Sequence, residues 1–309
     1  MQLPVIAIVG PTASGKTATA LELARLLKNH VPVEIISADS RQVFRYLDIG
    51  TAKPSSEELA EFPHHFIDCK NPDEYYSAGK FGAEAAIKTE ELLKNGIVPI
   101  IAGGSGLYVQ ALCDGFFEDP SEKSTEIRSK LQQRLETEGR DALYDELLKT
   151  DPDAAEMYLD KNPRRILRAL EFFKTSGKKF SKAFKSGEQQ RSFTTQLYGI
   201  RPEREMLYNR INRRCEAMWR DGIIDETESV LKMGYSQKLN SLNTVGYKET
   251  IAFLKGEMNA GEALAKMQQS TRRYAKRQIT WFRRDERIRW LDDAPKEIAK
   301  KIFKSMQLP

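Results

Sequence analysis

The stretch that most constrains the fold lies near the start of the chain and follows the pattern G-x-x-x-x-G-K-T, which is the P-loop motif. Before it, residues 4–9 form a short apolar run typical of a buried parallel strand, and after it residues 17–28 have apolar side chains at helical spacing. Strand, glycine loop and helix together predict that main-chain N–H groups bind a diphosphate or triphosphate. The predicted phosphate-binding residues are Gly10, Pro11, Thr12, Ala13, Ser14, Gly15, Lys16 and Thr17.

Two side chains of this motif add chemistry to the backbone cradle. Lys16 brings a full positive charge to the phosphates, and the hydroxyl of Thr17 can reach a metal ion. We therefore expect Mg²⁺ as the cofactor, with Thr17 as its protein ligand. The motif predicts a bound polyphosphate but does not specify the reaction.

Further apolar runs predict that the strand before the motif belongs to a parallel sheet. Helical patterns separate the early runs, the clearest one at residues 78–94, so the order is strand, helix, strand. The predicted fold is an α/β P-loop NTPase or kinase-like parallel sheet flanked by helices. The additional strands are expected at residues 33–38, 66–67, 97–102, 196–200 and 287–291.

The pattern changes near Asp119, where strand signals give way to charged helical sequence. Asn162 suits a helix N-cap, Pro163 its first turn, and Gly177 its C-terminal stop. We predict a helical insertion domain at residues 119–196 and a core formed by residues 1–118 and 197–309. Within the insertion, the polar stretch 178–191 is expected to be mobile.

The last part of the chain is helical to about Phe282 and strongly basic. Residues 264–290 hold nine basic and two acidic side chains, so this segment carries +7 whereas the whole chain carries +5. Such a concentration favours a polyanionic partner. An arginine-rich helix at residues 203–218 leaves the sheet where a diphosphate clamp would lie, because guanidinium groups bind phosphate in a bidentate manner.

Two polar turns follow predicted strands at the edge where ligands bind in open α/β sheets. Asp39 ends the strand at residues 33–38, and the glycine turn at residues 103–108 ends the next long strand. We expect Asp39 beside the P-loop. The alternative is that Asp39 only caps a following turn, a common use of aspartate. A polar loop at residues 50–54 could cover the site.

Composition excludes several classes of protein. The three cysteines, at positions 69, 113 and 215, form no C-x-x-C pair, which favours reduced thiols over a disulfide frame or a zinc site. No run approaches the ~18 apolar residues of a membrane helix, and the N-terminus lacks the features of a signal peptide. We expect a cytoplasmic protein without membrane association, and a monomer.

The motifs together point to one family. They are GPTASGKT at 10–17, ISADSRQVF at 36–44, DIGTAKP at 48–54, HHFID at 64–68, GGSGLY at 103–108, NPRRILRALE at 162–171, VGYKE at 245–249 and TRRYAKRQITWFRR at 271–284. In this order, over nearly the whole length, the set resembles the bacterial tRNA dimethylallyltransferases. The resemblance implies a P-loop kinase-like core, a helical insertion that moves on tRNA binding, and transfer of a dimethylallyl group from dimethylallyl diphosphate to the adenosine just 3′ of the anticodon.

The resemblance also implies roles for individual residues. Asp39 is the expected base for the adenine amine, and Lys16 and Arg214 are the expected diphosphate ligands. Ser105, with Thr17, is expected near the metal ion or the leaving group. Asp39, Ser105 and Arg214 are therefore the expected catalytic residues. The expected tRNA-binding residues, drawn from the resemblance and the basic segment, are Ser40, Gln42, Arg272, Lys276, Arg277, Gln278 and Arg283.

Three alternative functions remain at this point. A small-molecule kinase would use the same P-loop, although it would not require the basic C-terminal segment. Prenyl transfer to free adenine nucleotides is the second alternative, and the related enzymes with that activity typically lack an extended tRNA-binding part. A non-catalytic RNA-binding regulator is the third, and the intact Lys16, Thr17 and Asp39 argue against it.

Overall fold

The computed structural model describes residues 3–116, 125–186 and 191–306. Its contacts divide the chain into two compact units. The first unit contains Met1–Cys113 and Ser192–Pro309, and the second contains Asp114–Arg191. Both boundaries lie five residues earlier in the chain than the domain limits expected from the sequence.

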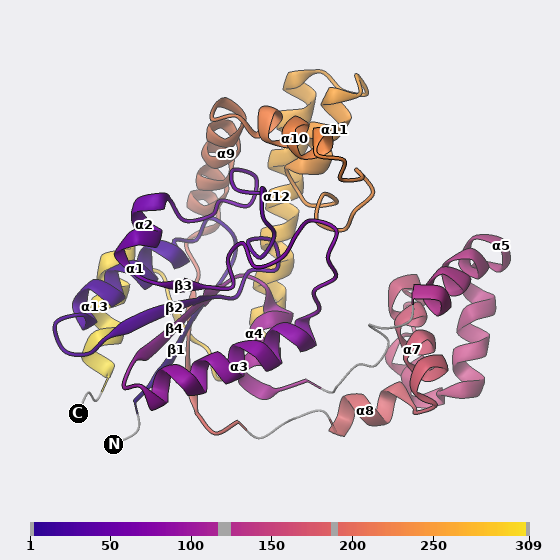
Figure 1. The fold of residues 1–309 in the computed structure, drawn as a ribbon, viewed down its shortest axis with the longest axis horizontal. Helices are drawn as coiled ribbons and strands as arrows, with labels where there is room; N and C mark the ends of the chain where they lie inside the picture. Colours follow the sequence, from indigo (N-terminus) through magenta and orange to yellow (C-terminus); the bar gives the residue numbers. More distant parts are fainter. Residues whose placement is uncertain (1–2, 117–124, 187–190, 307–309) are drawn as a thin grey trace. The chain divides into compact units, whose positions relative to one another are not determined.

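A six-stranded sheet forms the centre of the first unit, in the order β3-β2-β4-β1-β5-β6 (Figure 1). Every neighbouring pair of strands is parallel. The sheet therefore brings the ends of distant strands to one edge, beside the P-loop that follows β1. The strands are β1 (Val5–Val9), β2 (Val33–Ser37), β3 (His64–His65), β4 (Val98–Gly103), β5 (Thr195–Ile200) and β6 (Arg289–Leu291).

Both faces of this sheet are buried, which explains why its strands read as continuous apolar runs. Alternate side chains of β1 enter two different hydrophobic clusters: Val5, Ala7 and Val9 join one, and Ile6 and Ile8 join the other. The first cluster packs against α3 and α4, and the second against α1 and α13. Parallel sheets covered by helices on both faces are typical of α/β proteins.

Helices surround the sheet and continue beyond it. α1 and α13 pack closely together, and α9 packs against α12 through a separate cluster that includes Ile211 and Met267. The helices of this unit are α1 (Lys16–Leu27), α2 (Ser56–Glu61), α3 (Ala78–Lys94), α4 (Gly106–Asp114), α9 (Arg204–Arg220), α10 (Ile223–Lys232), α11 (Tyr247–Leu254), α12 (Ala260–Phe282) and α13 (Pro295–Ser305).

One predicted strand is displaced. The expected pair Phe66-Ile67 is not a strand; the strand is His64–His65, which pairs with β2. Phe66 leaves the extended conformation with φ +64°, and its ring packs edge-on against Phe81 at 5.2 Å between centroids. Burial of this aromatic side chain thus takes precedence over its strand propensity.

The second unit is helical and has its own hydrophobic cluster, which includes Leu143 and Ile166. Gly139, at φ +82° and ψ 170°, interrupts its longest helix. Asn162 accepts hydrogen bonds from the N–H groups of residues 164 and 165, and Gly177 ends that helix in a left-handed conformation, as predicted. The helices are α5 (Thr125–Thr150), α6 (Pro152–Met157), α7 (Pro163–Ser176) and α8 (Phe180–Ser186).

The expectation of a mobile stretch at residues 178–191 is wrong for its first half. α8 forms there because Phe180 is buried against Phe172, with their ring centroids 5.8 Å apart. Ser181 adds two hydrogen bonds to the buried carboxylate of Asp151, from its N–H at 2.9 Å and its hydroxyl at 2.6 Å. Residues 187–190 lie outside the described residues.

Within the described ranges, no helix combines the length and the apolar character needed to cross a membrane.

Candidate active site

The P-loop adopts a conformation that depends on its glycines. Gly10 has φ +148°, and a Cβ atom there would lie 2.5 Å from the carbonyl oxygen of Ile200 in β5. Gly15, at φ +100°, precedes the first residue of α1 in a left-handed conformation. Any side chain at Gly10 would clash with backbone, so the loop lies directly against the end of the neighbouring strand.

Lys16 lies inside this loop. Its Nζ donates a 2.7 Å hydrogen bond to the carbonyl oxygen of Pro11. Burial lowers the pKa of Lys16 to about 8, partly opposed by the charge of Asp39 and reinforced by that of Arg214. Lys16, Asp39 and Arg214 are therefore within electrostatic reach of one another, although they come from three different elements.

Arg214 reaches the P-loop from α9. Its guanidinium donates a hydrogen bond to the hydroxyl of Thr12, and burial lowers its pKa, opposed by the charges of Cys215 and Asp39. Among the described residues, the Nε of Arg214 and the hydroxyl of Ser14 in the loop itself are buried and have no hydrogen-bond partner. An unsatisfied buried donor costs about 1–3 kcal/mol, which an anionic ligand oxygen would relieve.

Asp39 lies two residues beyond the end of β2. The N–H of Arg41 donates a 2.9 Å hydrogen bond to Asp39 Oδ1, which fixes the carboxylate through an Asx-type turn. The alternative interpretation, that Asp39 stabilises a turn, thus describes a real contact. It does not exclude the functional one, because the side chain is half-buried beside Lys16 and Arg214.

Ser105 connects the turn after β4 to the turn after β2. It is 8% exposed, and its Oγ accepts a 2.9 Å hydrogen bond from the N–H of Ser40 and donates one to Ser40 Oγ at 3.1 Å. Tyr274 in α12 lies near this network, because the side chain of Ser105 and the charge of Asp39 both influence the pKa of its phenol. Burial, with the nearby charge of Asp39, raises the pKa of Tyr274 to about 12. Ser40, expected to contact tRNA, lies in this network.

Gln42 makes internal contacts instead of pointing freely outward. Its Oε1 accepts a 2.9 Å hydrogen bond from the hydroxyl of Ser37, and its Nε2 donates to the carbonyl oxygen of Ala52 at 3.0 Å. The side chain thereby ties the loop at residues 50–54 to the end of β2. Direct contact of Gln42 with tRNA stays a prediction, and it would require these bonds to be exchanged.

The predicted tRNA-binding residues of α12 and just beyond divide into two groups. Lys276, Arg277 and Arg283 are exposed, and the Arg277 guanidinium lies over the ring of Tyr274 at 5.6 Å. Arg272 and Gln278 are engaged within the protein instead. Arg272 donates to Asn212 Oδ1 in α9 at 2.5 Å, and Gln278 is 5% exposed.

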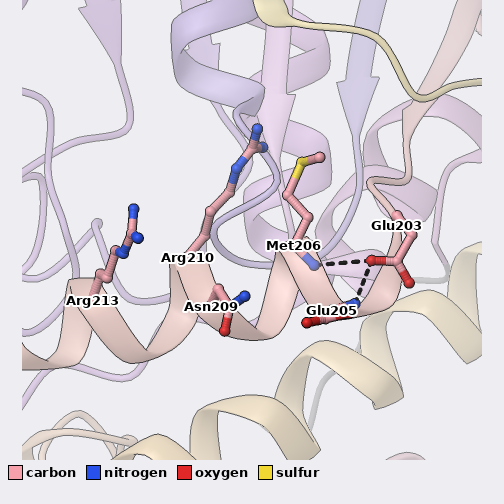
Figure 2. A pocket seen from close by; sticks show the side chains of 6 residues that line it. All are labelled: Glu203, Glu205, Met206, Asn209, Arg210 and Arg213. Carbon is pink, nitrogen blue, oxygen red and sulfur yellow. Dashed lines mark hydrogen bonds between the residues drawn. The ribbon is translucent and has the colours of Figure 1, made fainter.

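A shallow pocket lies along the first turns of α9, near the P-loop. Figure 2 shows Arg210 and Arg213 projecting from the same side of the helix. Arg210 approaches the carbonyl oxygen of Ser14 at 3.5 Å. The pocket also contains two carboxylates, so it is less positive than the arginines alone suggest. Its lining residues are Glu203, Glu205, Met206, Asn209, Arg210 and Arg213.

A carboxylate that the sequence interpretation missed organises the loop beside the site. Glu226 in α10 accepts hydrogen bonds from three successive main-chain N–H groups, those of residues 48, 49 and 50, at 2.7–3.2 Å. It also accepts one from the Tyr247 hydroxyl at 2.6 Å, and a Cβ on Gly50 would lie 2.5 Å from the Tyr247 ring. Tyr247 belongs to the recognised VGYKE segment, whereas no local pattern distinguishes Glu226 from other surface glutamates.

The protein atom expected to bind a metal ion at the P-loop is a hydroxyl oxygen. Among the described residues, no three His, Cys, Asp or Glu side chains gather as a metal cluster. The hydroxyl of Thr17, at the first turn of α1, is half-buried beside the P-loop. Magnesium typically binds few protein oxygens and completes its shell with water and substrate phosphates, so this arrangement fits Mg²⁺ better than a softer metal.

Comparisons with known proteins agree with the geometry. A family profile described as IPP transferase matches residues 42–285. The chain is 42% identical to a tRNA dimethylallyltransferase of Natranaerobius thermophilus over 289 residues, covering 94% of this chain and 86% of that protein. It is likewise 42% identical to one of Christiangramia forsetii, covering 97% and 96% of the two chains.

Solved structures give the same result for the fold. A tRNA delta(2)-isopentenylpyrophosphate transferase of Staphylococcus epidermidis is 36% identical, with a TM-score of 0.69 and 98% of both chains covered. A eukaryotic dimethylallyltransferase acting on tRNA is 27% identical, with a TM-score of 0.76, covering 94% of this chain and 74% of that one. The expected P-loop NTPase-like fold is thus confirmed.

Proposed function

Because this chain belongs to the tRNA dimethylallyltransferase family, we propose that it transfers the dimethylallyl group of dimethylallyl diphosphate to the exocyclic amine of the adenosine 3′-adjacent to a tRNA anticodon. Diphosphate is the leaving group. One observation carries the assignment: Lys16 of the phosphate loop and Arg214 of α9, which contacts that loop, both lie within electrostatic reach of the Asp39 carboxylate. A diphosphate bound at this loop would lie beside a proton acceptor.

The P-loop supplies the donor side of the reaction. As the bond between the allylic carbon and the diphosphate oxygen breaks, negative charge grows on the diphosphate, and preorganised donors that face this charge lower the barrier. Lys16 and Arg214 provide full charges, and the partnerless Ser14 Oγ and Arg214 Nε provide donors that await an acceptor. The same cradle that serves phosphate transfer in other proteins here serves alkyl transfer.

Magnesium fits beside these groups, with the Thr17 hydroxyl as its protein ligand. When bound, the ion would neutralise part of the charge on the diphosphate. The remaining ligands would come from the diphosphate and from water, in keeping with the small number of protein oxygens at the loop.

Asp39 supplies the acceptor side. Its Oδ1 is held by the Arg41 N–H, and Oδ2 is the atom that we assign to accept a proton from the adenine amine as the new carbon–nitrogen bond forms. General-base help of this kind is worth about 10²–10⁴-fold. An orienting role for Asp39, without proton transfer, would use the same geometry.

The tRNA would bind across the basic side of α12. Lys276, Arg277 and Arg283 are exposed there and can contact phosphates of the anticodon stem-loop. An anticodon-loop base can be splayed out and read on its edges, and the target base must leave the stack to reach Asp39. The protein would then act in the cytoplasm, where its tRNA is present, and no feature of the site requires more than a monomer.

The decisive experiment uses Mg²⁺, labelled dimethylallyl diphosphate and unmodified tRNA. We expect label in the tRNA, at the adenosine 3′ of the anticodon, and its loss in Asp39→Ala. Parallel reactions replace the tRNA by AMP and the donor by γ-labelled ATP. Label in AMP alone would favour prenyl transfer to free nucleotides, and γ-phosphate transfer without prenylation would favour a kinase; either result would overturn the proposal.

A further inference from the structure

Gln278 faces the protein interior, opposite to its basic neighbours on α12. Lys276 and Arg277 are exposed, whereas Gln278 is 5% exposed. A neutral amide is buried within a segment whose charges otherwise predict RNA contact. Buried polar groups are retained when they are fully hydrogen-bonded, so the partners of this amide show what it does.

Both ends of the Gln278 amide are engaged with backbone. Its Oε1 accepts a 2.8 Å hydrogen bond from the N–H of Thr12, and its Nε2 donates a 2.8 Å hydrogen bond to the carbonyl oxygen of Gly104. A Cβ on Gly104 would lie 2.3 Å from that Nε2, so the close approach depends on glycine. The amide oxygen of Gln278 accepts from an N–H group, and its NH₂ group donates to a carbonyl oxygen. An ionised carboxylate cannot reproduce this pairing, because it has no proton to donate.

The two loops joined by Gln278 are the two halves of the site. Thr12 belongs to the P-loop and accepts the hydrogen bond from Arg214. Gly104 directly precedes Ser105, whose Oγ holds the N–H of Ser40 next to Asp39. A single side chain thus links the diphosphate loop to the turn after β4, and Ser105 of that turn holds the turn that carries Asp39 through Ser40.

A neighbouring residue on the same helix face supports this link. Tyr274 lies four residues before Gln278, one helical turn away, and the pKa of its phenol is influenced by both Asp39 and Ser105. α12 therefore approaches the acceptor side through Tyr274 and contacts both sides through Gln278. Its opposite face carries the exposed basic residues.

We propose that Gln278 is a positioning residue that sets the separation between the donor diphosphate and the Asp39 carboxylate. This inference rests on the proposed function. Gln278 does not contact reacting atoms; it acts through Thr12 and Gly104. A misplacement of about 1 Å between reacting groups can cost about 10²-fold in rate, so one displaced loop is enough to produce a large effect on kcat.

The test compares Gln278→Glu and Gln278→Met with the wild type. Glutamate keeps the shape but presents an oxygen to the Gly104 carbonyl, and methionine keeps the length without either hydrogen bond. We expect kcat for tRNA prenylation to fall about 10²-fold in both, while the Kd values for tRNA and for inorganic diphosphate change less than about threefold. Gln269→Met, on the same helix, is the matched control and should keep kcat.

Three results would overturn the inference. Unchanged kcat in both variants would show that the separation does not depend on Gln278. A Kd for tRNA weakened more than tenfold at unchanged kcat would make Gln278 a direct tRNA contact, as the sequence suggested. A loss of kcat that merely follows the loss in Tm across the two variants would make its role purely structural.

The reaction of the wild type distinguishes a failure of this inference from a failure of the proposed function. If the wild type prenylates tRNA, the proposed function stands and the variants judge Gln278 alone. If the wild type does not prenylate tRNA, the proposed function fails first. Should Gln278→Met not fold, Gln278→Glu and the companion Tyr274→Phe, which removes only the phenol hydroxyl near Ser105, still test whether α12 positions the acceptor side.

Discussion

Arg214 donates a hydrogen bond to the hydroxyl of Thr12, so that a residue of α9 completes a phosphate loop 202 residues earlier in the chain. The contact holds the guanidinium against the P-loop, and among the described residues its buried Nε has no hydrogen-bond partner. The P-loop of this protein is therefore incomplete as a local motif. It acquires its second positive charge from a distant helix.

The contact between Arg214 and Thr12 predicts the effect of removing the positive charge of Arg214. Arg214→Gln should lower kcat by about 10²–10³-fold, the usual cost of losing one donor that faces developing negative charge. The neighbouring Arg213→Gln is the control, because Arg213 is exposed and lies one residue away on α9. Steady-state prenylation of tRNA by both variants checks the prediction, and an equal loss in the two would contradict it.

The pKa of Lys16 predicts a proton linkage in donor binding. In the free protein this pKa is lowered to about 8 from 10.5. Below about pH 7 the ammonium is already formed, so no proton is taken up. Near pH 8–9 a bound diphosphate raises the pKa again, and we expect uptake of up to about one proton together with weaker binding as pH rises.

Calorimetry of diphosphate binding, in buffers of different ionisation enthalpy at pH 7 and pH 8.5, measures this uptake. Lys16→Met should bind diphosphate more weakly, and its binding enthalpy at pH 8.5 should no longer differ between buffers. Equal proton uptake by the wild type and Lys16→Met at pH 8.5 would assign the linkage to another group.

The exposed basic residues predict the salt dependence of tRNA binding. Neutralising Lys276, Arg277 and Arg283 together should make the slope of log K against log salt shallower by up to about two to three, since each phosphate contact contributes ~0.7–0.9. Affinity for diphosphate should not change. The matched control neutralises Lys300, Lys301 and Lys304 of α13, which are also exposed. An identical change of slope in this control would show that the effect is not specific to Lys276, Arg277 and Arg283.

The hydrogen bonds of the Glu226 carboxylate predict that this residue contributes to the stability of the protein and takes no direct part in catalysis. Glu226→Ala removes the acceptor for three main-chain N–H groups and for the Tyr247 hydroxyl. We expect a loss of about 2–4 kcal/mol in the free energy of unfolding, because half-buried donors are left unpaired. Glu228→Ala, which breaks only an exposed pair with Lys232, should cost less than about 0.5 kcal/mol.

Denaturant unfolding of both variants provides the comparison. Similar midpoints for Glu226→Ala and the wild type would show that the loop at residues 48–50 finds other partners.

The parts of the fold that could be predicted from sequence are those set by local pattern. The P-loop, the buried strands and the capped helix that begins after Asn162 follow from apolar runs, glycines and a capping residue that lie close together in sequence. The displacement of β3 and the formation of α8 could not be predicted in this way. Both depend on where an aromatic ring, Phe66 or Phe180, finds a partner from another element.

The same distinction holds for the candidate site. Lys16 and Asp39 follow recognisable strands, so their proximity could be expected. The inward orientation of Gln278 could not, since its neighbours in sequence are exposed cations and only helix packing decides which side faces the P-loop. The role of Glu226 could not be predicted, because three of its hydrogen-bond partners are main-chain groups, which no sequence pattern identifies.

The hydrogen bond from Thr12 to Gln278 joins residues 266 positions apart, and this has a consequence for the order in which the chain is made. Synthesis at about 5–20 residues per second delivers the P-loop many seconds before α9 or α12 exists. During that interval the emerging chain has the phosphate-binding sequence but neither Arg214 nor Gln278 to complete it. A nascent or prematurely ended chain is therefore expected to be unable to hold the donor in a reactive position, so that catalytic competence appears only after α12 has been synthesised.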